Sequence, residues 1–221
     1  MSLFSSIDLY CERLSPEFWA EPVNAWTNLA FVAAALWAWT EARKHPPVPQ
    51  VITILITLTA LIGGGSFLFH TFANGLTEWA DVVPIWSFVA LYVLTAIHLV
   101  GGVPPRRVVR IGAIIAAVVV VVFLATGSSE HASGHSVLNG SLQYAPALIA
   151  LSVFSILTLA RKHPLSPWAV AATVVFAISL VFRTIDLEVC AAFPLGTHFM
   201  WHVLNGAMVA LLLQALVRNR L

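Results

Sequence analysis

The sequence predicts an all-α integral membrane protein, built as a bundle of seven transmembrane helices. Hydrophobic residues make up 59% of the 221 residues and charged residues only 10%, whereas soluble chains contain about 25% charged residues. The mean hydropathy is +0.89. Apolar runs of about 20 residues, the length that crosses a bilayer, recur along the chain. The net charge of +1 argues against a nucleic-acid-binding protein, which needs a basic surface.

Seven apolar segments are expected to form the helices: Val23–Thr40, Val51–His70, Val82–Val100, Val108–Thr126, Leu142–Ala160, Trp168–Phe182 and His198–Val217. Charged or Pro- and Gly-rich connections separate them: Glu41–Pro49, Thr71–Asp81, Gly101–Arg107, Gly127–Ser141, Arg161–Pro167 and Arg183–Thr197. The sixth segment is the shortest. Because the connections are short, residues 1–221 are expected to form one domain, an acidic N-terminal segment (1–22) followed by the bundle (23–217).

Charged residues alternate between the two ends of the predicted bundle. One set of alternate connections, together with the C-terminus, holds nine of the eleven Lys and Arg residues, and the other set holds nine of the ten Asp and Glu residues. A wrong helix count would scramble this pattern. Basic residues mark cytoplasmic loops, so the C-terminus is predicted to be cytoplasmic and the N-terminus non-cytoplasmic. The compact loops and the absence of a cleavable signal peptide favour a bacterial plasma membrane over a eukaryotic endomembrane.

Three histidines are expected to meet at the non-cytoplasmic end. His198 and His202 are four residues apart, so their imidazoles share one helix face. His70 ends the second helix, one turn after Ser66, and Asp81 opens the third helix at the same end. Three imidazoles with an open fourth position are typical of a catalytic zinc site, in which a bound water has a pKa of about 7. Asp81 would then act as acid and base, and Ser66 would stabilise the water or the oxyanion.

Each of these residues also has an ordinary structural interpretation. A histidine at a helix end can anchor in the membrane interface, Ser66 beside Gly63–Gly65 can allow close helix packing, and Asp81 can be an N-cap. The remaining histidines are weaker metal-ligand candidates, in loops or near the inner end of a helix: His45, His98, His131, His135 and His163.

The N-terminal segment concentrates oxygen ligands: Asp8, Glu12, Glu17, Glu21, Asn24 and Asn28. Such oxygens suit calcium, but the spacing is not that of an EF-hand, and a solvated acidic surface is the favoured interpretation from chemistry alone. Both cysteines, Cys11 and Cys190, are predicted to lie on the non-cytoplasmic side, where disulfides persist. Pairing and two free thiols both remain open from the residues themselves.

Taken together, Ser66-x3-His70, Asp81 and His198-x3-His202 in the last of seven predicted helices resemble the alkaline ceramidase family. That family belongs to a wider group of seven-helix hydrolases that includes the adiponectin-receptor-like proteins. Flanking residues extend the resemblance over the whole chain: Asp8…Cys11-Glu12, Glu21-x2-Asn24, Asp186-x3-Cys190 and His198-x2-Trp201-His202. The predicted topology agrees with that of alkaline ceramidases and is opposite to that of the adiponectin-receptor-like proteins.

The resemblance implies a role for each matching residue. His70, His198 and His202 match zinc ligands, Asp81 and Ser66 the catalytic acid/base and the stabilising serine, Cys11 and Cys190 a disulfide, and Asp8, Glu12 and Glu21 side-chain ligands of a calcium site. Two departures stand out. Leu14 occupies the place expected for an amide calcium ligand, and the stretch Arg13–Ala20 is shorter than in eukaryotic members.

The favoured hypothesis is therefore a membrane-embedded zinc amidohydrolase that cleaves ceramide or a related N-acyl lipid to a fatty acid and a sphingoid-type amine. Its partners are the bilayer and its lipid substrate, with no nucleic acid. The alternative is a seven-helix lipid receptor with a structural zinc ion. An open fourth position facing Asp81 favours turnover. A transporter or proton relay is less favoured, because no charged residue lies near the middle of a predicted span.

Overall fold

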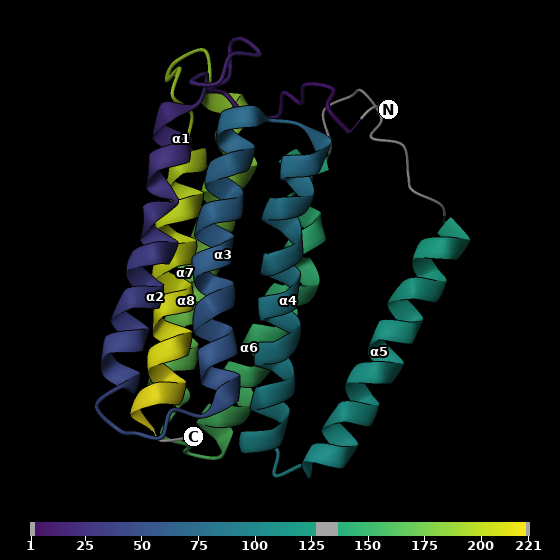
Figure 1. Ribbon diagram of the computed structural model, residues 1–221, viewed down its shortest axis with the longest axis vertical. Helices are drawn as coiled ribbons and strands as arrows, with labels where there is room; N and C mark the ends of the chain where they lie inside the picture. The colour runs from purple at the N-terminus through teal and green to yellow at the C-terminus, as the bar shows by residue number, and fades with distance from the viewer. Residues whose placement is uncertain (1–2, 127–136, 220–221) are drawn as a thin grey trace.

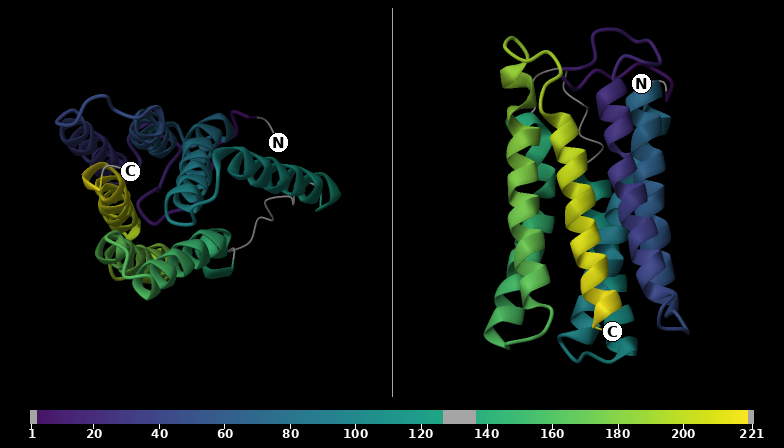
Figure 2. Two further views of the ribbon diagram at one scale, coloured as in Figure 1. Left: turned by 90° about the horizontal axis from the view of Figure 1, so that it is seen from below. Right: turned by 90° about the vertical axis from the view of Figure 1, so that its left-hand side faces the viewer.

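The computed structural model describes residues 3–126 and 137–219. Their helices form a bundle of roughly parallel and antiparallel helices, from which the helix of residues 105–126 leans away (Figure 1, Figure 2). The helices in chain order are α1 (Pro22–Thr27), α2 (Leu29–Ala42), α3 (Gln50–Phe72), α4 (Gly75–Leu99), α5 (Pro105–Thr126), the 3₁₀ segment η1 (Val137–Tyr144), α6 (Ala145–Ala160), α7 (Ser166–Val189) and α8 (His198–Arg218). Apart from an isolated bridge between Ser6 and Asn74, the described ranges contain no β-structure. The all-α prediction is confirmed.

Five segments of the described chain are long and apolar enough to cross a membrane: Gln50–Phe72, Gly75–Leu99, Leu138–Ala160, Ser166–Val189 and His198–Arg218. Large apolar side chains such as Leu61, Ile156 and Val181 are exposed on these helices, which suits contact with lipid. Helices satisfy their own backbone hydrogen bonds, as a spanning segment must. The chain is thus a multi-pass membrane protein, while the count of seven spans and the orientation of the termini stay predictions.

The first predicted helix, Val23–Thr40, is divided into α1 and α2 at Asn28. The side-chain amide of Asn28 donates to the carbonyl of Asn24 at 2.9 Å, and the backbone N–H of Asn28 bonds instead to the carbonyl of Ala25 at 3.3 Å. A side-chain donor thereby replaces one backbone donor of the helix ladder. The division is local, and α1 and α2 follow one another along one side of the bundle (Figure 1).

The sixth predicted helix, Trp168–Phe182, proved too short, because α7 continues to Val189. Arg183 and Asp186 were expected in a loop, and both instead lie buried inside the helix. The Asp186 carboxylate accepts hydrogen bonds from three backbone N–H groups, and Arg183 packs among aromatic rings. An unpaired charged residue must stay hydrated and therefore usually marks the end of an apolar helix. Arg183 and Asp186 have partners within the protein, so the helix continues past them.

The third predicted helix also begins earlier than expected. In α4 the N-cap is Asn74, whose side chain accepts the N–H of Thr77 at 3.1 Å, while the Thr77 hydroxyl accepts the N–H of Asn74 at 3.1 Å. Asp81 therefore lies in the second turn of α4, and its interpretation as an N-cap is wrong.

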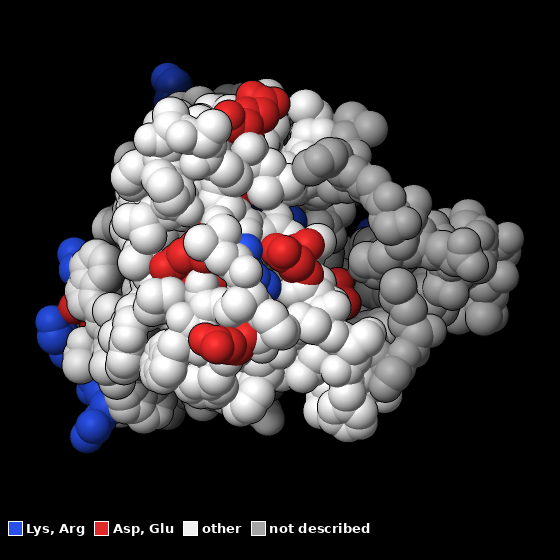
Figure 3. Space-filling view, turned by 90° about the horizontal axis from the view of Figure 1, so that it is seen from above, with Lys and Arg blue, Asp and Glu red and all other residues white. Residues whose placement is uncertain are grey.

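The N-terminal segment crosses the end of the bundle where α3 ends and α8 begins, and the end of α8 lies at the opposite end (Figure 1). A disulfide between Cys11 and Cys190, with Cα atoms 5.4 Å apart, ties this segment to the connection before α8. The predicted pairing of the two cysteines is present in the structure. Acidic side chains gather on this end when it is viewed from above (Figure 3).

Candidate metal centre

His70, His198 and His202 converge beneath the N-terminal segment. One ligand nitrogen from each lies within 4.8 Å of the others, and the ring centroids are 4.6–5.3 Å apart. His70 comes from the last turns of α3, and the other two come from the first two turns of α8. All three residues are only 1–2% exposed. They therefore cannot be interface anchors, and the structure brings together the residues that the spacing singled out.

Hydrogen bonds fix two of the three rings. Nδ1 of His70 lies 2.6 Å from Oε2 of Glu21, and Nδ1 of His202 lies 3.0 Å from the hydroxyl of Thr27. Because Glu21 can only accept, Nδ1 of His70 carries the proton and Nε2 is left free to bind a metal. Nδ1 of His198 is buried and has no hydrogen-bond partner in the described part of the chain. Such buried, unpaired imidazole nitrogens fit a divalent transition metal.

Ser66 and Asp81 face a small cavity beside the histidines. The cavity has a volume of about 20 Å³, and its polar lining residues are Tyr10, Ser66, Asp81, Tyr144, Arg183, His198 and His202. The side chain of Ser66 interacts with the Asp81 carboxyl group. Oδ1 of Asp81 is buried and has no hydrogen-bond partner among residues 3–126 and 137–219. This oxygen is thus available to a ligand in the cavity.

Gly65 determines how closely α3 and α4 approach at this point. A Cβ atom at this position would lie 2.0 Å from the carbonyl oxygen of Ala80, so a larger residue would push the helices apart. Ser66 and Asp81 follow these two residues in the chain. The glycine is thus a packing residue, and its packing brings the two polar side chains together.

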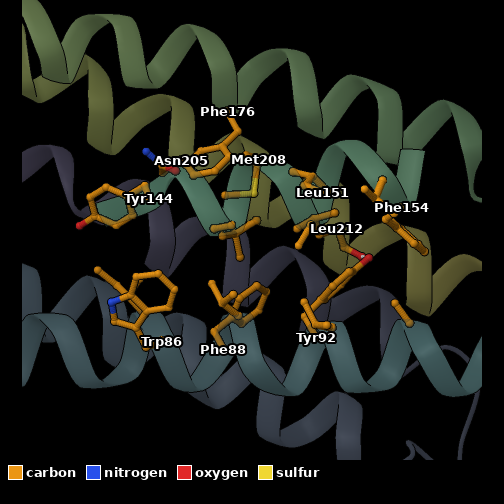
Figure 4. A pocket seen from close by; sticks show the side chains of 18 of the residues that line it. Trp86, Phe88, Tyr92, Tyr144, Leu151, Phe154, Phe176, Asn205, Met208 and Leu212 are labelled. Carbon is orange, nitrogen blue, oxygen red and sulfur yellow. The ribbon is translucent and has the colours of Figure 1, made fainter. Parts of the chain in front are cut away.

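A second cavity, with a volume of about 380 Å³, adjoins the first. Both are lined by Phe31, Ile62, Ile85, Tyr144 and Trp201. One wall is formed by α4, and the side chains of α6, α7 and α8 face it across the cavity (Figure 4). The lining includes Phe88, Leu151, Phe154 and Met208 and is almost wholly apolar. A hydrocarbon chain can lie here with its polar end at the metal centre.

A family model described as Ceramidase matches residues 4–220. The chain belongs to the ceramidase family. The matched range contains every residue of the metal centre, and membership implies a hydrolase that acts on the amide bond of ceramide. No curated protein matches the chain.

Arg183 is a residue of the candidate site that sequence reasoning missed. Its guanidinium lies 5.3–5.7 Å from the ring centroids of Tyr10, Tyr144 and Trp201, and Nη1 donates to the Tyr10 hydroxyl at 3.2 Å. Tyr10 in turn stacks on His198 with centroids 3.7 Å apart. Nε of Arg183 is buried and unpaired in the described residues. The sequence feature that could have revealed it is an arginine directly after an apolar segment, but this arginine was assigned to a loop.

The three carboxylates expected to bind calcium do not form a group that could hold an ion. Glu12 accepts two backbone N–H groups at the start of α1, at 2.7 and 2.8 Å, Glu21 is held by Arg13 and His70, and Asp8 is exposed. In the part of the chain that the structure describes, the three histidines are the one group of His, Cys, Asp or Glu side chains that could hold an ion. The residues present therefore do not fit calcium.

The weaker histidine candidates contribute nothing to the metal centre. His45, His98 and His163 lie outside the group of three, and Nδ1 of His98 instead bonds to the carbonyl of Val103 at 2.7 Å. His131 and His135 lie outside the described residues.

Proposed function

We propose that this chain is a membrane-embedded, zinc-dependent amidohydrolase that cleaves ceramide or a related N-acyl lipid to a free fatty acid and a sphingoid-type amine. One observation carries the proposal. Three buried imidazoles from α3 and α8 converge beside Asp81, whose Oδ1 is buried and unpaired within the described residues, where an apolar cavity of about 380 Å³ begins. An amide bond can react at the histidines and Asp81 while the attached acyl chain lies in the apolar cavity.

Zinc is the metal that best suits the ligands. Imidazole nitrogens suit zinc and other late transition metals, whereas calcium and magnesium prefer oxygen. No fourth His, Cys, Asp or Glu joins the three histidines in the described ranges, which supports an open position rather than a closed structural site. When bound there, zinc polarises the amide carbonyl and lowers the pKa of the attacking water.

The side chains around the cavity have separate tasks. Asp81 takes a proton from the attacking water and passes it to the departing amine, a task supported by its unpaired Oδ1. The hydroxyl of Ser66 stabilises negative charge on the former carbonyl oxygen. Arg183 adds a positive charge in a place where little water screens it. The aromatic rings around its guanidinium exclude water and hold it in place.

We place the metal centre on the external side of a bacterial plasma membrane, in a bundle of seven spans. The alternating charges of the connections support this orientation, and the disulfide at the same end requires an oxidising compartment. The ceramide acyl chain then enters the cavity between α4 and α6–α8, with the scissile amide at the outer rim.

The proposal is tested with the purified full-length protein in detergent micelles and ceramide with a labelled acyl chain. We expect about one zinc ion per chain, release of the labelled fatty acid, and loss of hydrolysis after chelation. His202→Ala should lose both zinc and hydrolysis. Stoichiometric zinc and ceramide binding without hydrolysis would instead show a receptor, and a protein that binds no zinc would overturn the proposal.

A further inference from the structure

We propose that Arg13 is a positioning residue: its guanidinium is a built-in cation that fixes Glu21 against the metal ligand His70, so that this end of the bundle assembles without calcium. The inference rests on the proposed function only in treating His70 as a metal ligand. It does not depend on which lipid is cleaved.

Arg13 is buried, and each of its nitrogen atoms has a partner. Nε donates to Oε1 of Glu21, Nη1 donates to the carbonyls of Ser15 and Glu17 at 3.1 and 3.4 Å, and Nη2 donates to the carbonyl of His70 at 3.1 Å. A buried cation is tolerated only when it is paired and hydrogen-bonded in this way. The guanidinium thus joins the N-terminal segment to the end of α3.

Glu21 is likewise fully engaged. Oε1 accepts from Arg13, while Oε2 accepts from Nδ1 of His70 at 2.6 Å and from the side-chain amide of Asn24 at 3.1 Å. A carboxylate that accepts from a ligand imidazole orients the ring and makes its other nitrogen a better donor to the metal.

Arg13 and Glu21 together hold His70 at two points, its backbone carbonyl and its ring. That carbonyl belongs to the last turn of α3, where carbonyl groups lack partners within the helix and the helix dipole favours a positive charge. Both the position and the rotation of the imidazole are therefore set by one buried ion pair.

Calcium has no place in this arrangement. It requires six to eight oxygen ligands, yet both oxygens of Glu12 and both oxygens of Glu21 already accept hydrogen bonds. Leu14, where an amide ligand was expected, has no side-chain oxygen. A calcium ion beside Glu21 would also lie next to the guanidinium of Arg13 and be repelled by it. The arginine therefore supplies the positive charge in place of a bound ion.

The experiment compares the wild-type protein with Arg13→Met, Arg13→Lys and the control Arg43→Met, which removes an exposed arginine near the end of α2. Zinc affinity is measured by competition with a chromogenic chelator, and thermal unfolding is recorded with EGTA or with added calcium. We expect added calcium to leave the unfolding temperature of the wild type and of Arg43→Met unchanged, and any effect of EGTA, which also binds zinc, to be reversed by zinc alone. Arg13→Met should bind zinc about 10- to 100-fold more weakly. Arg13→Lys should be intermediate, because a compact ammonium keeps the charge but lacks the planar fork with which the guanidinium reaches all these acceptors at once.

A spectroscopic measurement separates positioning from general stability. With cobalt(II) in place of zinc, Arg13→Met at full occupancy should show an altered visible absorption spectrum, because the His70 ring is no longer held. An unchanged spectrum with unchanged zinc affinity would overturn the positioning role. A wild-type protein that loses stability in EGTA and regains it with added calcium, but not with added zinc, would overturn the independence from calcium.

If Arg13→Met does not fold, Arg13→Lys provides the test. Its zinc affinity should be lower than that of the wild type, and an equal affinity would overturn the proposal. None of these measurements requires hydrolysis. The positioning role of Arg13 can therefore be confirmed while the proposed amidohydrolase activity is refuted, or the reverse.

Discussion

Asp186 caps the helix that carries His198. Oδ1 of Asp186, near the end of α7, accepts the backbone N–H of His198 at 2.9 Å and that of Thr197 at 2.6 Å. Its other oxygen accepts the N–H of Cys11 at 3.1 Å. Gly196 lies against the same carboxylate, with φ +62° and no room for a Cβ atom. One buried carboxylate therefore fixes the start of α8, which carries two of the three clustered histidines, and links it to the disulfide.

We expect Asp186→Asn to destabilise the protein, because the amide retains one acceptor oxygen and loses the negative charge at the start of α8. The loss of a charged N-cap contact costs about 1–2 kcal/mol, which should lower the thermal unfolding temperature and weaken zinc binding. Glu188→Gln is the matched control, since Glu188 is exposed on the same helix. Equal unfolding temperatures for the two variants would contradict the capping role.

Gly65 and Gly64 provide a second test, because only one of the two is in contact with another helix. In Gly65→Ala the new methyl group would collide with the carbonyl of Ala80, whereas a Cβ atom on Gly64 meets no atom within 4 Å. We expect Gly65→Ala to lower the free energy of unfolding by about 1–3 kcal/mol and to reduce hydrolysis by separating Ser66 from Asp81. Gly64→Ala should be neutral or slightly stabilising. Similar behaviour of the two variants in thermal unfolding would refute the close approach of α3 and α4.

Asp81→Asn should separate chemistry from metal binding. Asparagine retains the shape of the side chain but cannot accept the proton from water, so we expect kcat for ceramide hydrolysis to fall by about 100- to 10,000-fold. Zinc content should stay at the wild-type level, because Asp81 is not part of the histidine group. Turnover is measured by fatty acid release, and zinc by elemental analysis of the same preparation. A variant that loses its zinc would show that Asp81 is a ligand instead.

The histidines could be predicted from the sequence because helix geometry is local. The spacing of His198 and His202 places them on one face, and helix parity places His70 at the same end of the bundle. Arg13 could not be assigned in this way, because its nearby partners lie in an irregular segment and its contact with His70 spans 57 residues. Arg183 could not be assigned because its partners are mainly aromatic rings. The end of α7 was missed for the same reason, whereas the earlier start of α4 is set by the local pair Asn74 and Thr77. A charged residue indicates a loop only if it lacks a partner inside the protein.

The large cavity predicts how acyl-chain length is selected. Ala150 on α6 lines the cavity, whereas its neighbour Ile149 is exposed on the outer side of the helix. Ala150→Phe should fill part of the space and hinder a long acyl chain, while a short chain still fits. A misfit of about 1–3 kcal/mol corresponds to a loss of about 5- to 150-fold in kcat/KM for long-chain ceramide. Ile149→Phe is the control and should leave the ratio of long-chain to short-chain hydrolysis unchanged. If Ala150→Phe also keeps the wild-type ratio, the acyl chain does not lie in this cavity.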